Sequence, residues 1–99
     1  MIRHVVMWKM AAEDAGVRAA HAAEVARLLN ALDGVVPELR AVSAGPNVAF
    51  PETNFDVVLV ADVDSLEALA AYQVHPAHEE AAVYIRSVAA SRAAVDFEI

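Results

Sequence analysis

The sequence predicts a single α+β domain, residues 1–99, in which strands and helices follow the order βαββαβ. Apolar side chains alternate or run continuously at four places along the chain, as they do in strands. Between these places, apolar residues recur at spacings of three and four, which is typical of helices. The four prolines all stand at segment boundaries or in loops, so none interrupts a predicted element.

The first strand is predicted at residues 2–10 and the first helix at residues 14–32. The strand is rich in Val and aromatic side chains and is apolar on both faces at its middle, so we expect both faces to be covered. Asp14 can cap the start of the helix, Gly34 follows its end, and Pro37 forbids its continuation.

Two further strands are predicted at residues 39–44 and 55–63. The first of these ends at the turn sequence Gly-Pro-Asn of residues 45–47, and a loop leads on to the second. The second is apolar on both faces at its centre and acidic at its ends. We therefore expect it, like the first strand of the chain, to be covered on both sides.

The second helical stretch opens at Asp64 or Ser65, where a Glu three residues after Asp64 matches a capping box. Pro76 breaks this stretch and suits the first turn of a further helix that runs to about residue 90. Residues 92–99 alternate again and close the chain as a strand. The order is that of a ferredoxin-like fold, an antiparallel four-stranded sheet with helices on one face.

The composition limits the partners and the location that we expect. Hydrophobic residues make up 59% of the chain and the strand centres are apolar on both sides, which predicts a homodimer through the second sheet face. The net charge of −7 and the scattered basic residues argue against nucleic acid. Without a membrane-length apolar run, a signal-peptide core or a cysteine, the chain is expected to be cytoplasmic with no membrane partner.

The segment from Tyr72 to His78 reads Tyr-Gln-Val-His-Pro-Ala-His and holds half of the chain's four histidines. If His78 lies in the first helical turn after Pro76, it can act as a general base for proton abstraction next to a carbonyl, with Tyr72 as hydrogen-bond donor. Alternatively, one histidine caps the helix and the other is a surface or satisfied core residue. A metal site is a third interpretation, but the spacing of His75, His78 and Glu79 matches none of the well-attested zinc patterns.

His4 and Asp96 are two further polar residues on predicted strands. A histidine on an apolar strand face is most often structural, but in a cavity it would be one of few polar groups, as in small-molecule sites. Asp96 points away from Val95 and Phe97 and toward the space of His4, where it could orient His78 and stabilise its imidazolium. A solvated acid on an edge strand is the alternative for Asp96.

Together these segments resemble the stress-responsive dimeric α/β-barrel (Dabb) family over essentially the whole chain. The resemblance is carried by residues 2–9, 43–47, 72–78 and 95–98, with the His-Pro-x-His element as a fairly specific part. It implies a homodimer whose two sheets form a shared barrel, with a pocket between sheet and helices in each subunit. Within the family, the chain is similar to a plant polyketide cyclase, which closes a ring by aldol condensation without metal or organic cofactor.

The resemblance also implies roles for individual residues. His78 would be the general base, Tyr72 would hold the substrate oxygen, and Asp96 would be the acidic residue of the last strand. No metal and no cofactor are implied. The residues expected to line the ligand pocket are His4, Val6, Trp8, Val58 and His75.

Three departures from that cyclase limit what the resemblance transfers. Mostly Ala surrounds His21 where the cyclase has bulky aromatic residues, Asp56 stands in place of a histidine, and Trp8 replaces an aliphatic residue. The expected ligand is therefore only a small, partly apolar, oxygen-rich molecule. A non-catalytic dimeric protein for ligand binding or stress tolerance is the alternative. An oxidative enzyme of the monooxygenase kind shares the fold but not this motif.

Overall fold

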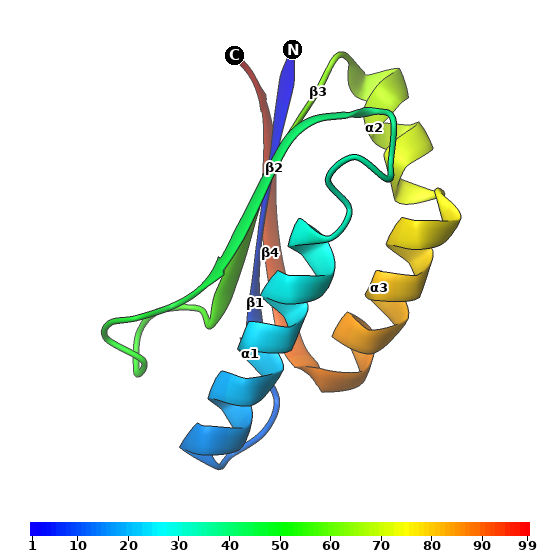
Figure 1. Cartoon of the computed structure of the whole chain (residues 1–99). Helices are drawn as coiled ribbons and strands as arrows, with labels where there is room; N and C mark the ends of the chain where they lie inside the picture. Colours follow the sequence, from blue (N-terminus) through cyan, green and yellow to red (C-terminus); the bar gives the residue numbers. More distant parts are fainter.

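Four strands and three helices make up the chain in the computed structural model, which describes all 99 residues (Figure 1). The predicted order is confirmed, and the second helical stretch is divided in two at Pro76. None of the helices is both long and apolar enough to cross a membrane. The elements are β1 (Ile2–Met10), α1 (Ala15–Asn30), β2 (Leu39–Pro46), β3 (Val57–Val63), α2 (Leu66–Gln73), α3 (Pro76–Val88) and β4 (Ala89–Glu98).

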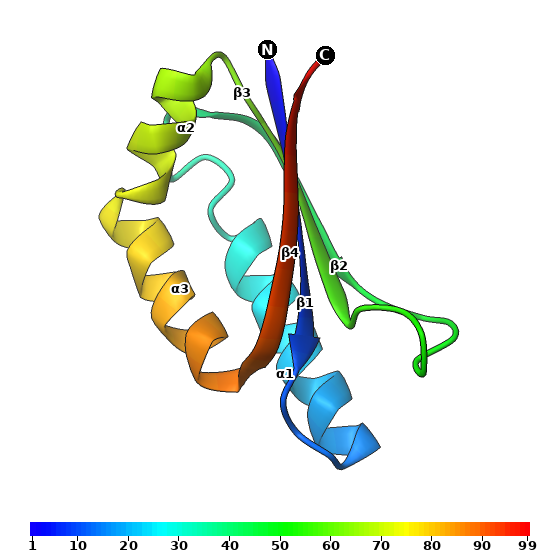
Figure 2. The ribbon, with the colours of Figure 1, turned by 180° about the vertical axis from the view of Figure 1, so that it is seen from behind.

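The strands form one antiparallel sheet in the order β2-β3-β1-β4. Figures 1 and 2 show all three helices on one face of this sheet and no element on the other. At the centre, Val6 of β1 lies opposite Leu59 of β3 and opposite Ala94 of β4. This is the predicted ferredoxin-like βαββαβ fold with a four-stranded antiparallel sheet.

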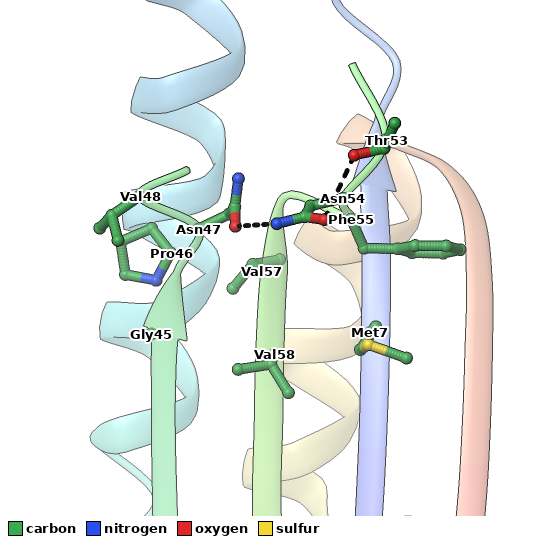
Figure 3. A pocket seen from close by; sticks show the side chains of 10 residues that line it. All are labelled: Met7, Gly45, Pro46, Asn47, Val48, Thr53, Asn54, Phe55, Val57 and Val58. Carbon is green, nitrogen blue, oxygen red and sulfur yellow. Dashed lines mark hydrogen bonds between the residues drawn. The ribbon is translucent and has the colours of Figure 1, made fainter. Parts of the chain in front are cut away.

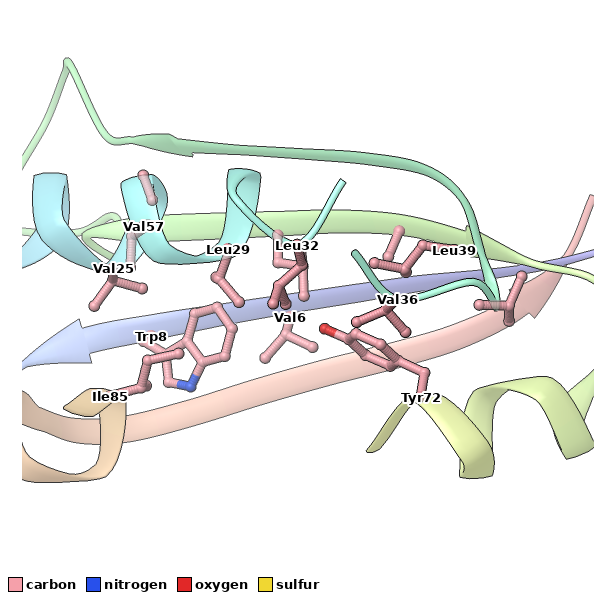
Figure 4. Close-up of a cluster of buried hydrophobic side chains, with 14 of the residues drawn as sticks. Val6, Trp8, Val25, Leu29, Leu32, Val36, Leu39, Val57, Tyr72 and Ile85 are labelled. Atoms are coloured by element: carbon pink, nitrogen blue, oxygen red, sulfur yellow. The ribbon is translucent and has the colours of Figure 1, made fainter. Parts of the chain in front are cut away.

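The hydrophobic core lies between the helices and the covered face of the sheet (Figure 4). Side chains alternate along a strand, so every second residue of β1 and β3 is buried against the helices. Leu29 of α1 and Tyr72 of α2 meet this face, and both side chains are almost fully buried. His4 is the single buried polar or charged residue, so it sits in an otherwise apolar core.

The opposite face of the sheet, which we call the open face, is apolar at its centre and uncovered. Met7, Val95 and Phe97 are 37%, 62% and 44% exposed. Val58 and Val60 of β3 lie on the same face, because Val58 pairs with Met7 across the strands. Exposed apolar surface of this extent is typical of a contact surface. Within one chain, the central strands are thus covered on one side only.

The first helix begins as predicted and ends two residues earlier. The Asp14 carboxylate accepts a hydrogen bond from the Val17 N–H at 2.9 Å and so caps α1. Gly34 follows the helix with a φ of 76°, a left-handed conformation that glycine adopts without strain. In α2 the cap is Ser65, whose Oγ accepts from a backbone N–H at 3.1 Å, while Asp64 instead pairs with an arginine of β2.

Three strand boundaries differ from the prediction. β2 runs two residues further, to Pro46, which is tolerated because β2 is an edge strand. β3 begins at Val57, two residues late, because the Asp56 carboxylate turns to the Met10 N–H at 2.7 Å and to Arg18 at 3.1 Å. β4 begins three residues early, since a register shift at the end of β1 extends the pairing to residue 89.

Candidate functional site

A pocket of about 250 Å³ opens between the covered face of the sheet and helices α2 and α3. Its floor comes from β1 and β3, and its sides come from α3 and the edge strand β4. Apolar side chains form most of the wall, with a few polar groups among them, which is the usual make-up of a small-molecule site. The lining residues are His4, Val6, Trp8, Leu29, Leu59, Gln73, His78, Ala82, Ile85, Arg86 and Arg92.

His78 is held in the first turn of α3 as a half-buried side chain. Pro76 starts the helix, and the Nδ1 atom of His78 lies 3.0 Å from the carbonyl oxygen of Gln73. A carbonyl can only accept a hydrogen bond, so Nδ1 carries the hydrogen and Nε2 of the neutral ring keeps a free lone pair. Burial is the main cause that lowers the pKa of His78, so the ring is neutral at pH 7.

Tyr72 places a phenol directly beside this imidazole. The ring centroids of Tyr72 and His78 are 4.5 Å apart, and His4 lies edge-on to Tyr72 at 6.1 Å. Figure 4 shows the Tyr72 oxygen directed away from α2, toward the part of the core that holds Val6. The hydroxyl is buried and has no hydrogen-bond partner. Burial raises the pKa of Tyr72 to about 12, so at neutral pH it remains a hydrogen-bond donor.

Asp96 orients His4 rather than His78, which corrects the prediction. His4 and Asp96 face each other across the β1–β4 pair, and His4 Nδ1 is hydrogen-bonded to the Asp96 Oδ1 atom. His78 lies on a helix and uses the Gln73 carbonyl instead. A carboxylate accepts the Nδ1 hydrogen of His4, which leaves Nε2 of His4 as the free nitrogen. Two imidazoles therefore line the pocket, each held at Nδ1.

His75 does not line the pocket, so this expectation is also corrected. It is the N-cap of α3, and its Nδ1 accepts a hydrogen bond from the Ala77 N–H at 3.1 Å. His75 therefore caps the helix, which is one of the alternatives that the sequence left open. The cap positions the turn that carries His78. With His75 used in this way, no group of three or more His, Cys, Asp or Glu side chains is placed to hold a metal ion.

Val58 is the second expected lining residue that lies elsewhere. It lines a separate hollow of about 490 Å³ on the open face, next to the loop between β2 and β3 (Figure 3). This hollow contains no titratable side chain, so it offers no acid or base. Val58 follows a buried residue of β3, and a shift of one residue along a strand changes the face.

Sequence reasoning missed Arg86 and Arg92, which both line the pocket. Arg86 follows His78 by eight residues on α3, close to two helical turns, so the two share a helix face. Arg92 lies opposite Trp8 in the β1–β4 pair and therefore faces the pocket side. Helical spacing could have identified Arg86, whereas Arg92 depends on the strand register.

The lowered pKa of His78 predicts a loss of stability in acid. The unfolded histidine takes up a proton near its ordinary pKa of about 6.5, before the folded one does. The contribution of His78 to stability is thus complete above pH of about 6.5 and is lost as the pH falls toward the folded pKa. We expect an NMR titration midpoint below 6.5 for His78. A midpoint at or above that value would contradict the burial described here.

The fold and the pocket together define a class, a small ferredoxin-like α+β domain with a His–Tyr pair between sheet and helices. A family model described as the stress responsive A/B barrel domain, Dabb, matches residues 2–99. The chain therefore belongs to the Dabb family, as the sequence predicted. The comparison with curated proteins gives no match.

Solved structures agree with this fold. A dimeric protein of unknown function from Bacteroides fragilis is 23% identical, with a TM-score of 0.89 over 99% of this chain and 95% of that one. A dimeric ferredoxin-like protein from Thermobifida fusca is 30% identical, with a TM-score of 0.83 over 99% and 90%. A hydroxynitrile lyase from Passiflora edulis is 13% identical, with a TM-score of 0.77 over 99% and 92%, and shares the fold.

Proposed function

We propose that this protein is a homodimeric, cofactor-independent enzyme that abstracts a proton next to a carbonyl group and closes a ring by an aldol-type reaction. The substrate is a small, partly apolar, oxygen-rich molecule held in the pocket between sheet and helices. The observation that carries the proposal is the buried Tyr72 hydroxyl, which has no partner in the protein. Its ring lies 4.5 Å, centroid to centroid, from the ring of His78, although Tyr72 itself is not among the lining residues of the pocket. Buried polar groups are normally satisfied, so an orphan donor next to a neutral base supports a ligand oxygen as its partner.

The proposed reaction uses a neutral His78 imidazole and a protonated Tyr72 hydroxyl. The His78 Nε2 lone pair takes a proton from the carbon next to a carbonyl, and the electron pair of the C–H bond moves onto the carbonyl oxygen. The Tyr72 hydroxyl donates a hydrogen bond to this enolate oxygen. The enolate carbon then attacks a second carbonyl of the same molecule, and the His78 imidazolium returns the proton to the new alkoxide.

The dimer is proposed to form through the open face. The exposed apolar residues Met7, Val95 and Phe97 lie on this face, and its centre carries no charge. The similar solved structures from Bacteroides fragilis and Thermobifida fusca are described as dimeric. Two sheets packed face to face bury this surface without covering the pocket, which opens on the other side of each sheet.

Replacement of His78 tests the catalytic part of the proposal. We expect His78→Gln to slow enzyme-dependent deuterium uptake into poly-β-keto acids and thioesters by about 10²–10⁴-fold, because general-base catalysis contributes about that much. Measurement by NMR in deuterium oxide separates enzymatic from spontaneous exchange. The matched control is His75→Asn, which keeps a good N-cap and leaves the exchange rate unchanged.

The alternative is a non-catalytic protein that binds its ligand in the same pocket. It predicts no enzyme-dependent exchange by the wild type on the whole panel, together with ligand-induced stabilisation that His78→Gln leaves intact. That pair of results would show that the protein binds a ligand in this pocket without catalysing a reaction on it.

A further inference from the structure

We infer that the ligand of this pocket carries a carboxylate, bound by the guanidinium groups of Arg86 and Arg92 at the pocket mouth. The inference rests on the proposed function for the opposite, reacting end of the ligand, at His78 and Tyr72. It adds the substrate class: a keto acid with an apolar body, rather than a neutral ketone.

The pairing of the basic residues carries the inference. Arg3, Arg18, Arg27 and Arg40 each form an ion pair with an acidic side chain. Arg86 and Arg92 form neither an ion pair nor a side-chain hydrogen bond, and both line the same pocket. The chain's remaining basic residue, Lys9, is also unpaired but alternates onto the open face of β1.

The charge of the whole chain makes these two arginines unusual. With 14 acidic and 7 basic residues, the chain has ample carboxylates to pair with every arginine. Asp96, the acid nearest in sequence on the same face of β4 as Arg92, is bonded to His4 instead. Two positive groups in one pocket of an acidic protein create a local field that favours an anion.

The shape of the pocket assigns the anion to one end of the ligand. Trp8 lies opposite Arg92 across the β1–β4 pair, and Ala82 and Ile85 stand between His78 and Arg86 on α3. An apolar body against these three side chains places its anionic end at the arginines and its carbonyl at the His–Tyr pair. Arginine binds planar carboxylates in a bidentate manner, which gives direction as well as affinity.

Calorimetric titration with matched acids and esters tests the inference. The probes are phenylpyruvate, benzoylacetate and benzoylpropionate, each beside its methyl ester, with inorganic phosphate as a separate arm. We expect at least one acid to bind about tenfold or more tightly than its ester, because a charge-assisted hydrogen bond contributes about that factor. Arg86→Gln with Arg92→Gln removes this preference, and the control Arg27→Gln on the outer surface of α1 retains it.

Three results would overturn the inference: no acid binds better than its ester, the double variant keeps the preference while circular dichroism shows it folded, or phosphate binds as tightly as the acids. The last result would indicate that the anionic group of the ligand is a phosphate rather than a carboxylate. His78→Gln separates this inference from the proposed function. If His78→Gln keeps both acid binding and proton exchange, the catalytic proposal fails and the carboxylate site stands.

Discussion

Replacing Tyr72 with phenylalanine is expected to raise the free energy of unfolding by about 1 kcal/mol and to remove most of the catalytic activity. The Tyr72 hydroxyl is buried and has no partner among the protein groups, so the folded state loses hydrogen bonds to bulk water and gains none from the protein. An unsatisfied buried polar group of this kind costs about 1–3 kcal/mol, and phenylalanine keeps the packing of the ring. The same change removes the donor to the enolate oxygen, which we expect to cost about 10²-fold or more in rate.

Two further substitutions separate the hydroxyl from the ring. Tyr72→Ala removes the ring as well and should lower the free energy of unfolding by about 3–5 kcal/mol, as for other large core residues. Tyr84→Phe is the matched control, because Tyr84 is the only other tyrosine and is half-buried on α3, and its hydroxyl is not a buried, unpartnered group. Urea unfolding of the three variants measures the stabilities. A Tyr72→Phe protein that is less stable than wild type would contradict the conclusion that the Tyr72 hydroxyl is buried without a hydrogen-bond partner.

The pH dependence of stability gives an independent check on Tyr72. Its pKa of about 12 in the folded state lies above the ordinary value of about 10 for the unfolded chain. Titration of Tyr72 therefore leaves the free energy of unfolding unchanged below pH of about 10 and lowers it as the pH rises toward 12, because the unfolded state loses the proton first. Tyr72→Phe lacks this group, so its stability should fall less than that of the wild type over the same alkaline range.

A single charge on the open face, introduced by Val58→Asp, is expected to dissociate the dimer. Val58 pairs with Met7 on the two inner strands of the sheet, where a facing sheet would leave a carboxylate without water or a partner. A buried, unpaired charge costs several kcal/mol, so we expect the dimer dissociation constant to rise by more than about 100-fold. Sedimentation velocity over a range of concentrations measures this change.

Val83→Asp provides the matched control for the open face. Val83 is 62% exposed on α3, on the helix side of the sheet, so the same substitution adds the same charge away from the proposed interface. It should leave the dimer intact. Equal dimer stability in Val58→Asp and Val83→Asp would reject the sheet-face dimer.

The order of the elements and the start of α1 could be predicted because they depend on local chemistry. Asp14 and Pro76 each fix a helix start through contacts within a few residues, and the predictions at both positions agree with the structure. The sequence left the choice between Asp64 and Ser65 open, and a contact distant in sequence decides it in favour of Ser65. Arg40, distant in sequence, takes the Asp64 carboxylate and leaves Ser65 as the cap.

The site was harder to predict because strand register decides which side chains of neighbouring strands come into contact. Alternation along the strands predicts that His4 and Asp96 face the same side of the sheet. Their direct contact also requires the β1–β4 register, which no local sequence pattern encodes. The same dependence on register kept Arg92 from being predicted, whereas Val58 was expected in the pocket from the resemblance alone and lies one residue out of phase with the buried positions of β3. Residues on α3 are different, since His78 and Arg86 share a face by helical spacing alone.

The junction between α2 and α3 holds the base from both sides. His75 closes the first turn of α3 through a lone pair on Nδ1, which accepts the Ala77 N–H. The His78 ring, three residues further on, is bonded through Nδ1 to the carbonyl oxygen of Gln73, the last residue of α2. The direction of the base therefore depends on the length of this junction, so inserting one residue there should displace His78 while leaving the strands that form the pocket floor in place.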